Sequence, residues 1–138
     1  MAGSVVQAVE VNPRRTVAVV TIDWTGDAAN GSVPDTPLSG SVMGAITDHF
    51  LYTVTTDPGS PAPTNNYDVT LVDGAGFDIL GGSGADRDAA NSERALPKVG
   101  TDRHYPLVHG ALTFKLAGNS VASAKGRVVL VFVKDRPL

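Results

Sequence analysis

The chain has 138 residues, a formal net charge of −3 at neutral pH and no cysteine. Without cysteine it forms no disulfide and offers no thiolate to a metal or a substrate. The negative charge and the scattered Lys and Arg residues argue against a nucleic-acid partner, which is bound by clustered basic side chains. The length fits a single domain, and 42% hydrophobic against 18% charged residues is a globular composition.

No apolar stretch approaches the ~20 residues of a membrane span. The first residues, Met-Ala-Gly-Ser-Val-Val-Gln, lack the basic and apolar regions of a signal peptide. We therefore expect no membrane partner and synthesis in the cytoplasm.

Period-two alternation of apolar and polar residues predicts the first two strands. One candidate is Val5 to Val11, and residues 1–12 as a whole form either an N-terminal arm or an edge strand. The next candidate, Thr16 to Trp24, alternates strictly and turns polar on one face at Asp23 as it ends.

The middle of the chain contains weaker signals. Ser41 to Asp48 fits neither period well, and we expect a strand there because Gly44 disfavours a helix. The run from His49 to Thr55 directs three side chains to one buried face: Phe50, Tyr52 and Val54. Tyr67 to Val72 and Phe77 to Leu80 are separated by Asp73-Gly74-Ala75-Gly76, a turn-rich link that predicts a hairpin.

Two strands are predicted near the C-terminus. Leu112 to Leu116 alternates as a strand with one buried and one solvent-facing side does. Val128 to Val133 is apolar on both faces. It is therefore either a central strand covered on both sides or a strand at a subunit interface.

These runs predict an all-β fold with about seven strands and no long helix. A single antiparallel β-sandwich or flattened barrel over residues 1–138 is the expected closure. Three long loops rich in Gly and Pro connect the strands, at residues 26–40, 56–66 and 81–98. Loops of this length in a compact domain usually have a function or move.

No constellation of residues predicts catalysis. The Gly-rich start of the third loop lacks the Lys of a phosphate-binding loop, and Asp86 and Asp88 would repel an anion. There is no Gly-x-Ser-x-Gly elbow, no His-Glu-x-x-His and no pair of glutamates at glycosidase spacing. We therefore expect a protein that binds and assembles, with no enzymatic activity and no cofactor.

Metal and sugar binding are weaker alternatives. Four aspartates invite a calcium site but lack EF-hand spacing, so solvated turn carboxylates are the favoured interpretation: Asp73, Asp78, Asp86 and Asp88. His104 and His109 lie five residues apart, which is unsuited to chelation from one strand. Four aromatic side chains could form a sugar platform, although packing is favoured: Trp24, Tyr52, Tyr67 and Tyr105.

Beyond composition, the order of turn and strand motifs over roughly residues 20 to 133 resembles small virion structural proteins of tailed phages and prophages. The motifs that carry the resemblance are Ile22-Asp23-Trp24-Thr25, residues 55–59, 62–64, 67–73, 78–82 and 85–87, and Gly110-Ala111-Leu112-Thr113. The resemblance implies a head decoration (cement) protein that binds the major capsid protein on the outer surface of the virion, after synthesis in the host cytoplasm. By analogy it also implies a homo-oligomer, with a trimer favoured.

For such a protein the loops and the N-terminal residues are the expected contact segments. Seven residues are candidates for the interface: Val5, Val6, Pro58, Pro61, Pro63, Asp86 and Arg87. The alternatives are a neck, tail or fibre-associated virion protein and a carbohydrate-binding module.

Overall fold

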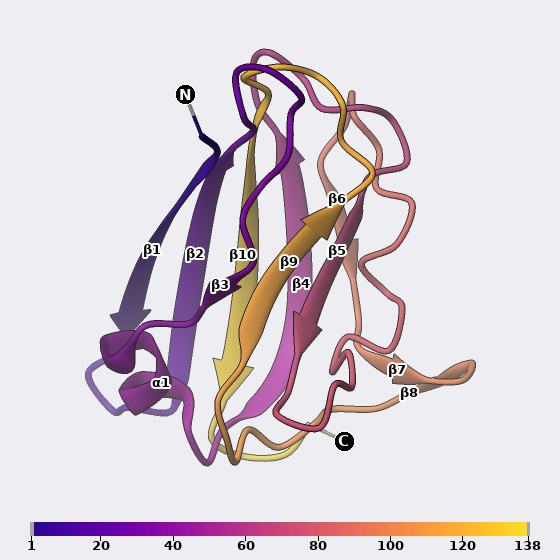
Figure 1. The fold of residues 1–138 in the computed structure, drawn as a ribbon. Helices are drawn as coiled ribbons and strands as arrows, with labels where there is room; N and C mark the ends of the chain where they lie inside the picture. Colours follow the sequence, from indigo (N-terminus) through magenta and orange to yellow (C-terminus); the bar gives the residue numbers. More distant parts are fainter. Residues whose placement is uncertain (1, 138) are drawn as a thin grey trace.

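Residues 2–137, which the computed structural model describes, form two antiparallel β-sheets that face each other (Figure 1). The large sheet has the order β1-β2-β10-β4-β6, with β1 Ser4–Val11, β2 Val17–Thr25, β10 Lys125–Val133, β4 Phe50–Pro58 and β6 Glu93–Ala95. The small sheet has the order β3-β9-β5, with β3 Thr36–Pro37, β9 Thr113–Ala117 and β5 Asp68–Val72. A hairpin of β7 (Lys98–Val99) and β8 (Asp102–Arg103) and one helix, α1 (Gly40–Ile46), complete the elements.

The all-β class is confirmed, and the sheets form a sandwich that does not close into a barrel. The runs expected at residues 5–11, 16–24, 49–55, 67–72, 112–116 and 128–133 all form strands. Met1 of the predicted N-terminal arm lies outside the described residues, and most of that arm is the edge strand β1. No helix within residues 2–137 is long and apolar enough to cross a membrane.

The core lies between the two sheets, and strict alternation builds it. In β2, every second residue from Ala18 to Trp24 is at most 1% exposed, and the residues between them are half-buried. The other strands contribute Leu51 and Val54 from β4, Val69 and Leu71 from β5, Phe114 and Leu116 from β9, and Val128, Leu130 and Phe132 from β10. Each strand of the sandwich thus turns one face inward, as period-two alternation requires.

Strand β10 lies between β2 and β4 and pairs with both over most of its length. Of the two interpretations of Val128 to Val133, the internal one is right for one face, where Phe132 is fully buried. The opposite face, with Val129 and Val131, is only half-buried, and the small sheet does not lie over it (Figure 1). The chain therefore covers one of the two apolar faces of its central strand.

The predicted facing of β4 is wrong at Phe50, which pairs with Val133 of the outer face, and at Tyr52, which is 39% exposed. Val131 pairs with Thr53 whereas the next residue, Phe132, pairs with Leu51, so Tyr52 is the extra residue of a β-bulge. The bulge shifts the alternation by one residue and brings Leu51 into the core.

The strand predicted for residues 41–48 is wrong, because α1 occupies most of this segment. The Ser39 hydroxyl caps the helix by accepting the N–H of Val42 at 3.3 Å. Val42 and Ile46, four residues apart, are both buried against the core. Gly44 lies on the exposed side, so its low helix propensity is outweighed by the cap and the apolar stripe.

The strand predicted for Phe77 to Leu80 is also wrong, although the segment does lie beside β5. It forms one isolated bridge, between Val72 and Asp78. The Asp78 carboxylate accepts the backbone N–H of Leu71 at 3.0 Å and that of Leu80 at 3.1 Å. A side chain thus takes the place that a neighbouring strand's carbonyl would occupy.

Four short strands raise the total above the expected number of about seven. They lie in or after the predicted loops and have only two or three residues each: β3, β6, β7 and β8. Runs this short carry no periodicity that a sequence pattern could reveal.

The two faces of β10 give a direct test of this architecture. Phe132→Asp is expected to lower the free energy of unfolding by more than about 4 kcal/mol or to prevent folding, because it buries an unpaired charge. Val131→Asp, one residue away on the outer face, is the matched control and is expected to cost no more than about 2 kcal/mol. Urea titration followed by circular dichroism measures both. Equal losses would show that both faces of β10 are enclosed.

Candidate functional site: the outer face of the large sheet

The outer face of the large sheet carries a contiguous apolar patch on its two central strands. In the sheet register, Val17 lies beside Val133, and Val19 lies beside Val131. Together with Val129, these side chains form what we call the valine patch: Val17, Val19, Val129, Val131 and Val133. All five are half-buried, so they are flanked by neighbours on the same face but not covered.

The patch arises from the alternation that builds the core. Because successive side chains in a strand point to opposite faces, a central strand with an apolar residue at every position must place half of these residues outward. In most antiparallel sheets with one solvated face those positions are polar. The apolar outer positions of β2 and β10 therefore are not required by the chain's own core.

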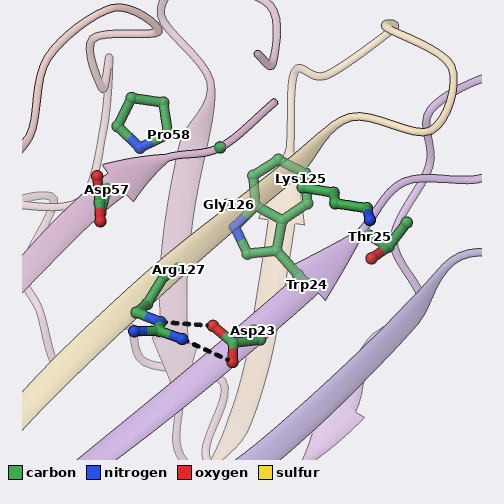
Figure 2. A pocket seen from close by; sticks show the side chains of 9 residues that line it. Asp23, Trp24, Thr25, Asp57, Pro58, Lys125, Gly126 and Arg127 are labelled. Carbon is green, nitrogen blue, oxygen red and sulfur yellow. Dashed lines mark hydrogen bonds and ion pairs between the residues drawn. The ribbon is translucent and has the colours of Figure 1, made fainter. Parts of the chain in front are cut away.

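A row of charged side chains crosses the same face at one end of the patch. Asp23, Arg127 and Asp57 lie side by side on β2, β10 and β4. Arg127 donates to both carboxylate oxygens of Asp23, from Nε at 2.7 Å and from Nη2 at 3.2 Å (Figure 2). Asp57 accepts a hydrogen bond from the Ser92 hydroxyl at 2.8 Å.

The Asp23–Arg127 pair contributes little to folding. The hydrogen bond and charge of Asp23 raise the pKa of Arg127 above its ordinary value. Both side chains are about half exposed, at 48% and 53%, and ion pairs in such surroundings add little to stability because water screens them. The row is therefore better suited to presenting alternating charges at the surface than to holding the sheet together.

The charged row borders a trough of about 390 Å³, which Thr25 and Lys125 also line (Figure 2). A second hollow of about 270 Å³ follows the groove between β1 and β2 and shares Asp23 and Arg127 with the first. The outer face is thus hollowed along the edge of the valine patch, with carboxylates and cations on the walls.

The inner side of the sheet beneath the trough is packed tightly around Trp24. The indole ring lies against Gly126, where a Cβ atom would come within 2.5 Å of a ring carbon. Tyr67 packs on Trp24 with ring centroids 5.8 Å apart. Burial raises the pKa of Tyr67, and the Thr56 hydroxyl lowers it by a smaller amount. Trp24 and Tyr67 are therefore core residues, as the favoured packing interpretation predicted.

Of the four candidate aromatics, Tyr52 and Tyr105 remain at the surface. Their ring centroids are 5.7 Å apart and their planes are tilted by 49°. The bulge at Tyr52 is what turns this side chain outward.

The seven predicted interface residues are not brought together at one place. Val6, Pro61 and Asp86 are exposed, Val5, Pro58 and Arg87 are half-buried, and Pro63 is buried. Val5 and Val6 point to opposite faces of β1, and it is Val6, at 64% exposure, that joins the outer face.

The loops that carry the other candidates are tied to the body of the protein. Lys125 donates its backbone N–H to the carbonyl of Pro61 at 2.9 Å. The Asn119 side chain accepts the N–H of Thr64 at 3.0 Å. Arg87 donates its N–H to the carbonyl of Tyr67 at 2.8 Å. These loops are therefore fixed edges of the sandwich and not free arms.

The acidic turns use their carboxylates on the backbone. Asp73 accepts the N–H groups of Ala75 and Phe77, both at 3.0 Å. The Asp88 pKa is lowered because Ala90 and Asn91 donate hydrogen bonds to its carboxylate. Within residues 2–137, no three His, Asp or Glu side chains gather in a geometry that could hold a metal ion.

The histidines occupy two environments. His104 and His109 are exposed and line a hollow of about 460 Å³ at one end of the sandwich. His49 is 6% exposed, and its Nδ1 lies 3.3 Å from the carbonyl of Thr47.

No protein-family model matches the chain, and no curated protein matches it. Among solved structures, a chain of the cyanophage Pam1 capsid asymmetric unit is similar, with a TM-score of 0.40 and 16% sequence identity. The match covers 98% of this chain and 88% of that chain.

The sequence predicts an apolar outer face at residues 128–133 only as one of two interpretations, a strand at a subunit interface, and it does not predict the charged row. The sequence marks Asp23 as the polar end of a strand, but its partners Arg127 and Asp57 lie far away in the sequence. Charged residues at outward positions near the ends of three predicted strands were the available signal, and using it requires the strand order.

The contact between Trp24 and Gly126 gives a second prediction. Gly126→Ala is expected to lower the free energy of unfolding by about 1–3 kcal/mol, because the new methyl group overlaps the indole ring. Gly44→Ala is the matched control, since its Cβ atom would meet nothing within 4 Å on the exposed side of α1. That variant is expected to gain about 0.5–1 kcal/mol. The denaturant midpoints of both variants measure these changes. An unchanged midpoint for Gly126→Ala would contradict the tight packing of Trp24 on Gly126.

Proposed function

We propose that this protein is a non-enzymatic phage virion protein that decorates and stabilises the capsid by binding the major capsid protein. The observation that carries the proposal is the uncovered valine patch beside a charged, hollowed rim. An apolar centre with a polar border is the usual anatomy of a protein–protein interface. The phage setting comes from the order of sequence motifs described above.

The patch suits attachment in many copies. Full burial of an exposed valine side chain contributes about 1.5 kcal/mol, and half-buried valines contribute less. A single copy therefore binds modestly, after the cost of immobilising it is subtracted. A capsid offers many equivalent binding sites. Weak binding is enough to fill these sites when the protein is abundant or when its copies are linked to each other.

The charged row supports orientation of the bound protein. A cation between two carboxylates, on three neighbouring strands, is matched only by the complementary order of charges on a partner. Because Asp23, Arg127 and Asp57 lie at one end of the valine patch, they would fix the direction in which the sheet lies on the capsid. On this proposal the protein is located on the outer surface of the virion.

Copy number separates this proposal from the first alternative, a neck, tail or fibre-associated protein. Decoration requires a number of copies comparable with that of the major capsid protein. Quantitative mass spectrometry of purified virions is expected to show that ratio. A handful of copies per particle would favour the neck or tail, and none would refute both.

A carbohydrate-binding module is the second alternative, and the surface pair of Tyr52 and Tyr105 is the observation that favours it. Sugars stack on flat, exposed aromatic faces, whereas these two rings are tilted against each other. A glycan array probed with and without calcium is expected to show no binding. Specific hits that are lost in Tyr52→Ala would favour this alternative instead.

The valine patch itself can be tested by substitution. Val131→Asp is expected to abolish binding to purified capsids that lack this protein, because it places a charge in the centre of the interface. Val99→Asp is the matched control, since Val99 is 63% exposed on the β7–β8 hairpin, away from the patch. Co-sedimentation with capsids measures binding, and circular dichroism verifies that both variants fold. Binding that survives Val131→Asp would rule out the patch as the docking surface.

A further inference from the structure

The sheet edges of this protein are unequally protected. Strand β6, one edge of the large sheet, has three residues and two charges, Glu93 and Arg94. In the small sheet, β3 has two residues, one of them Pro37. Strand β5 is covered by the segment after it, since Val69 donates its N–H to the carbonyl of Gly84 at 2.8 Å. Short strands, charges, proline and covering loops are the usual means by which edges avoid pairing with other chains.

Strand β1, the other edge of the large sheet, is neither short, nor rich in charges, nor broken by proline. The neighbouring segment 37–39 is bonded to the Gln7 side chain and not to the backbone of β1. Strand β1 has eight residues, pairs with β2 in unbroken register, and contains no proline, no lysine and a single charge, Glu10. Figure 1 shows it as the outermost strand of the sheet, with no strand beyond it. A long, regular and largely apolar edge of this kind is a template for a further strand.

The register identifies the backbone groups that point to the free edge. Asn12 donates its N–H to the carbonyl of Val17 at 3.1 Å, so residues 12 and 17 form a hydrogen-bonded pair. Because bonded and non-bonded pairs alternate along an antiparallel ladder, the even-numbered residues of β1 bond to β2. The odd-numbered residues direct their N–H and C=O groups outward: Val5, Gln7, Val9 and Val11. Within residues 2–137, these backbone groups make no hydrogen bond to another element.

The side chains of the same residues lie at the rim of the core. Val5, Val9 and Val11 pack against it and are half-buried, whereas the equivalent residues of β2 are almost fully buried. A strand added beside β1 would therefore satisfy the outward backbone groups and also complete the burial of three valines.

We propose that β1 pairs antiparallel with β1 of a second copy of this chain about a two-fold axis, which gives a dimer in place of the trimer implied by the resemblance. Strands β6, β3 and β5 are protected as described, and β7 and β8 have only two residues each, so β1 is the strand that another copy can supply. Centring the pair on Ala8 places Val5 opposite Val11 and Gln7 opposite Val9 of the second copy, which matches all outward backbone groups. The charged Glu10 then lies opposite Val6, so that like charges do not meet.

The two-fold axis stands perpendicular to the sheet, because antiparallel strands in one sheet are related in that way. The outer faces of both copies therefore point to the same side. The dimer presents two valine patches on one continuous sheet. This inference does not depend on the proposed function, since the pairing forms in solution without a capsid.

The absence of cysteine in the chain allows a clean cross-linking test. In Ala8→Cys, two thiols meet on the axis, at a non-hydrogen-bonded pair whose Cα atoms are about 4.5 Å apart, within disulfide range. Mild oxidation is expected to give a covalent dimer in nearly full yield. Glu10→Cys is the control on the same strand and face, where the two thiols lie about 13 Å apart along the strand and no cross-link is expected.

Sedimentation equilibrium tests the unmodified protein. The wild type is expected at twice the mass of the 14.2 kDa chain at micromolar concentration. Val9→Pro removes one outward N–H without breaking the ladder to β2, and is expected to weaken dimerisation at least tenfold, whereas Val9→Ala keeps the N–H and stays dimeric. A monomeric wild type, a trimer unaffected by Val9→Pro, or equal cross-linking of both cysteine variants would overturn the proposal. If Val9→Pro fails to fold, the cysteine pair decides alone.

Discussion

The rest of this structure depends on one constraint. The central strand of the large sheet is apolar on both faces, but a second layer covers only one of them. Strand β10 has apolar residues at every position from Val128 to Val133, and the small sheet can cover only one side of it. The covered side, centred on Phe132, organises the core. The other side leaves the valine patch at the surface, and its neighbours on β2 extend that patch rather than shield it.

The loops serve this two-layer arrangement by closing its ends. The Asn119 side chain alone joins three loops, since its oxygen accepts the N–H of Thr64 and its nitrogen donates to the carbonyls of Gly31 and Val121. Carboxylates of the acidic turns likewise satisfy backbone N–H groups that no strand reaches. Long loops rich in Gly and Pro suggested flexible binding arms, but their polar side chains are used internally. The surface that is available for binding is therefore on the sheet.

Strands with strict alternation, such as β2 and β9, could be predicted because period two is a local property of the sequence. The errors have non-local or competing causes. Helix α1 depends on the cap at Ser39 and on a core that receives Val42 and Ile46, which outweigh the penalty of Gly44. The outward turn of Tyr52 comes from a bulge that only the register with β10 defines. The row of Asp23, Arg127 and Asp57 requires the strand order, which no local pattern contains.

Because the sheet edges are unequally protected, the number of copies that can join the sheet by strand addition is limited. A protein with two open edges can add copies at both sides without end, and strand addition then leads to fibres. Here one edge of the large sheet is open, and the short, charged strand β6 closes the other. Strand addition therefore stops after one event, whichever strand β1 accepts. A chain with one open edge can in this way pair with a second strand at high concentration without polymerising.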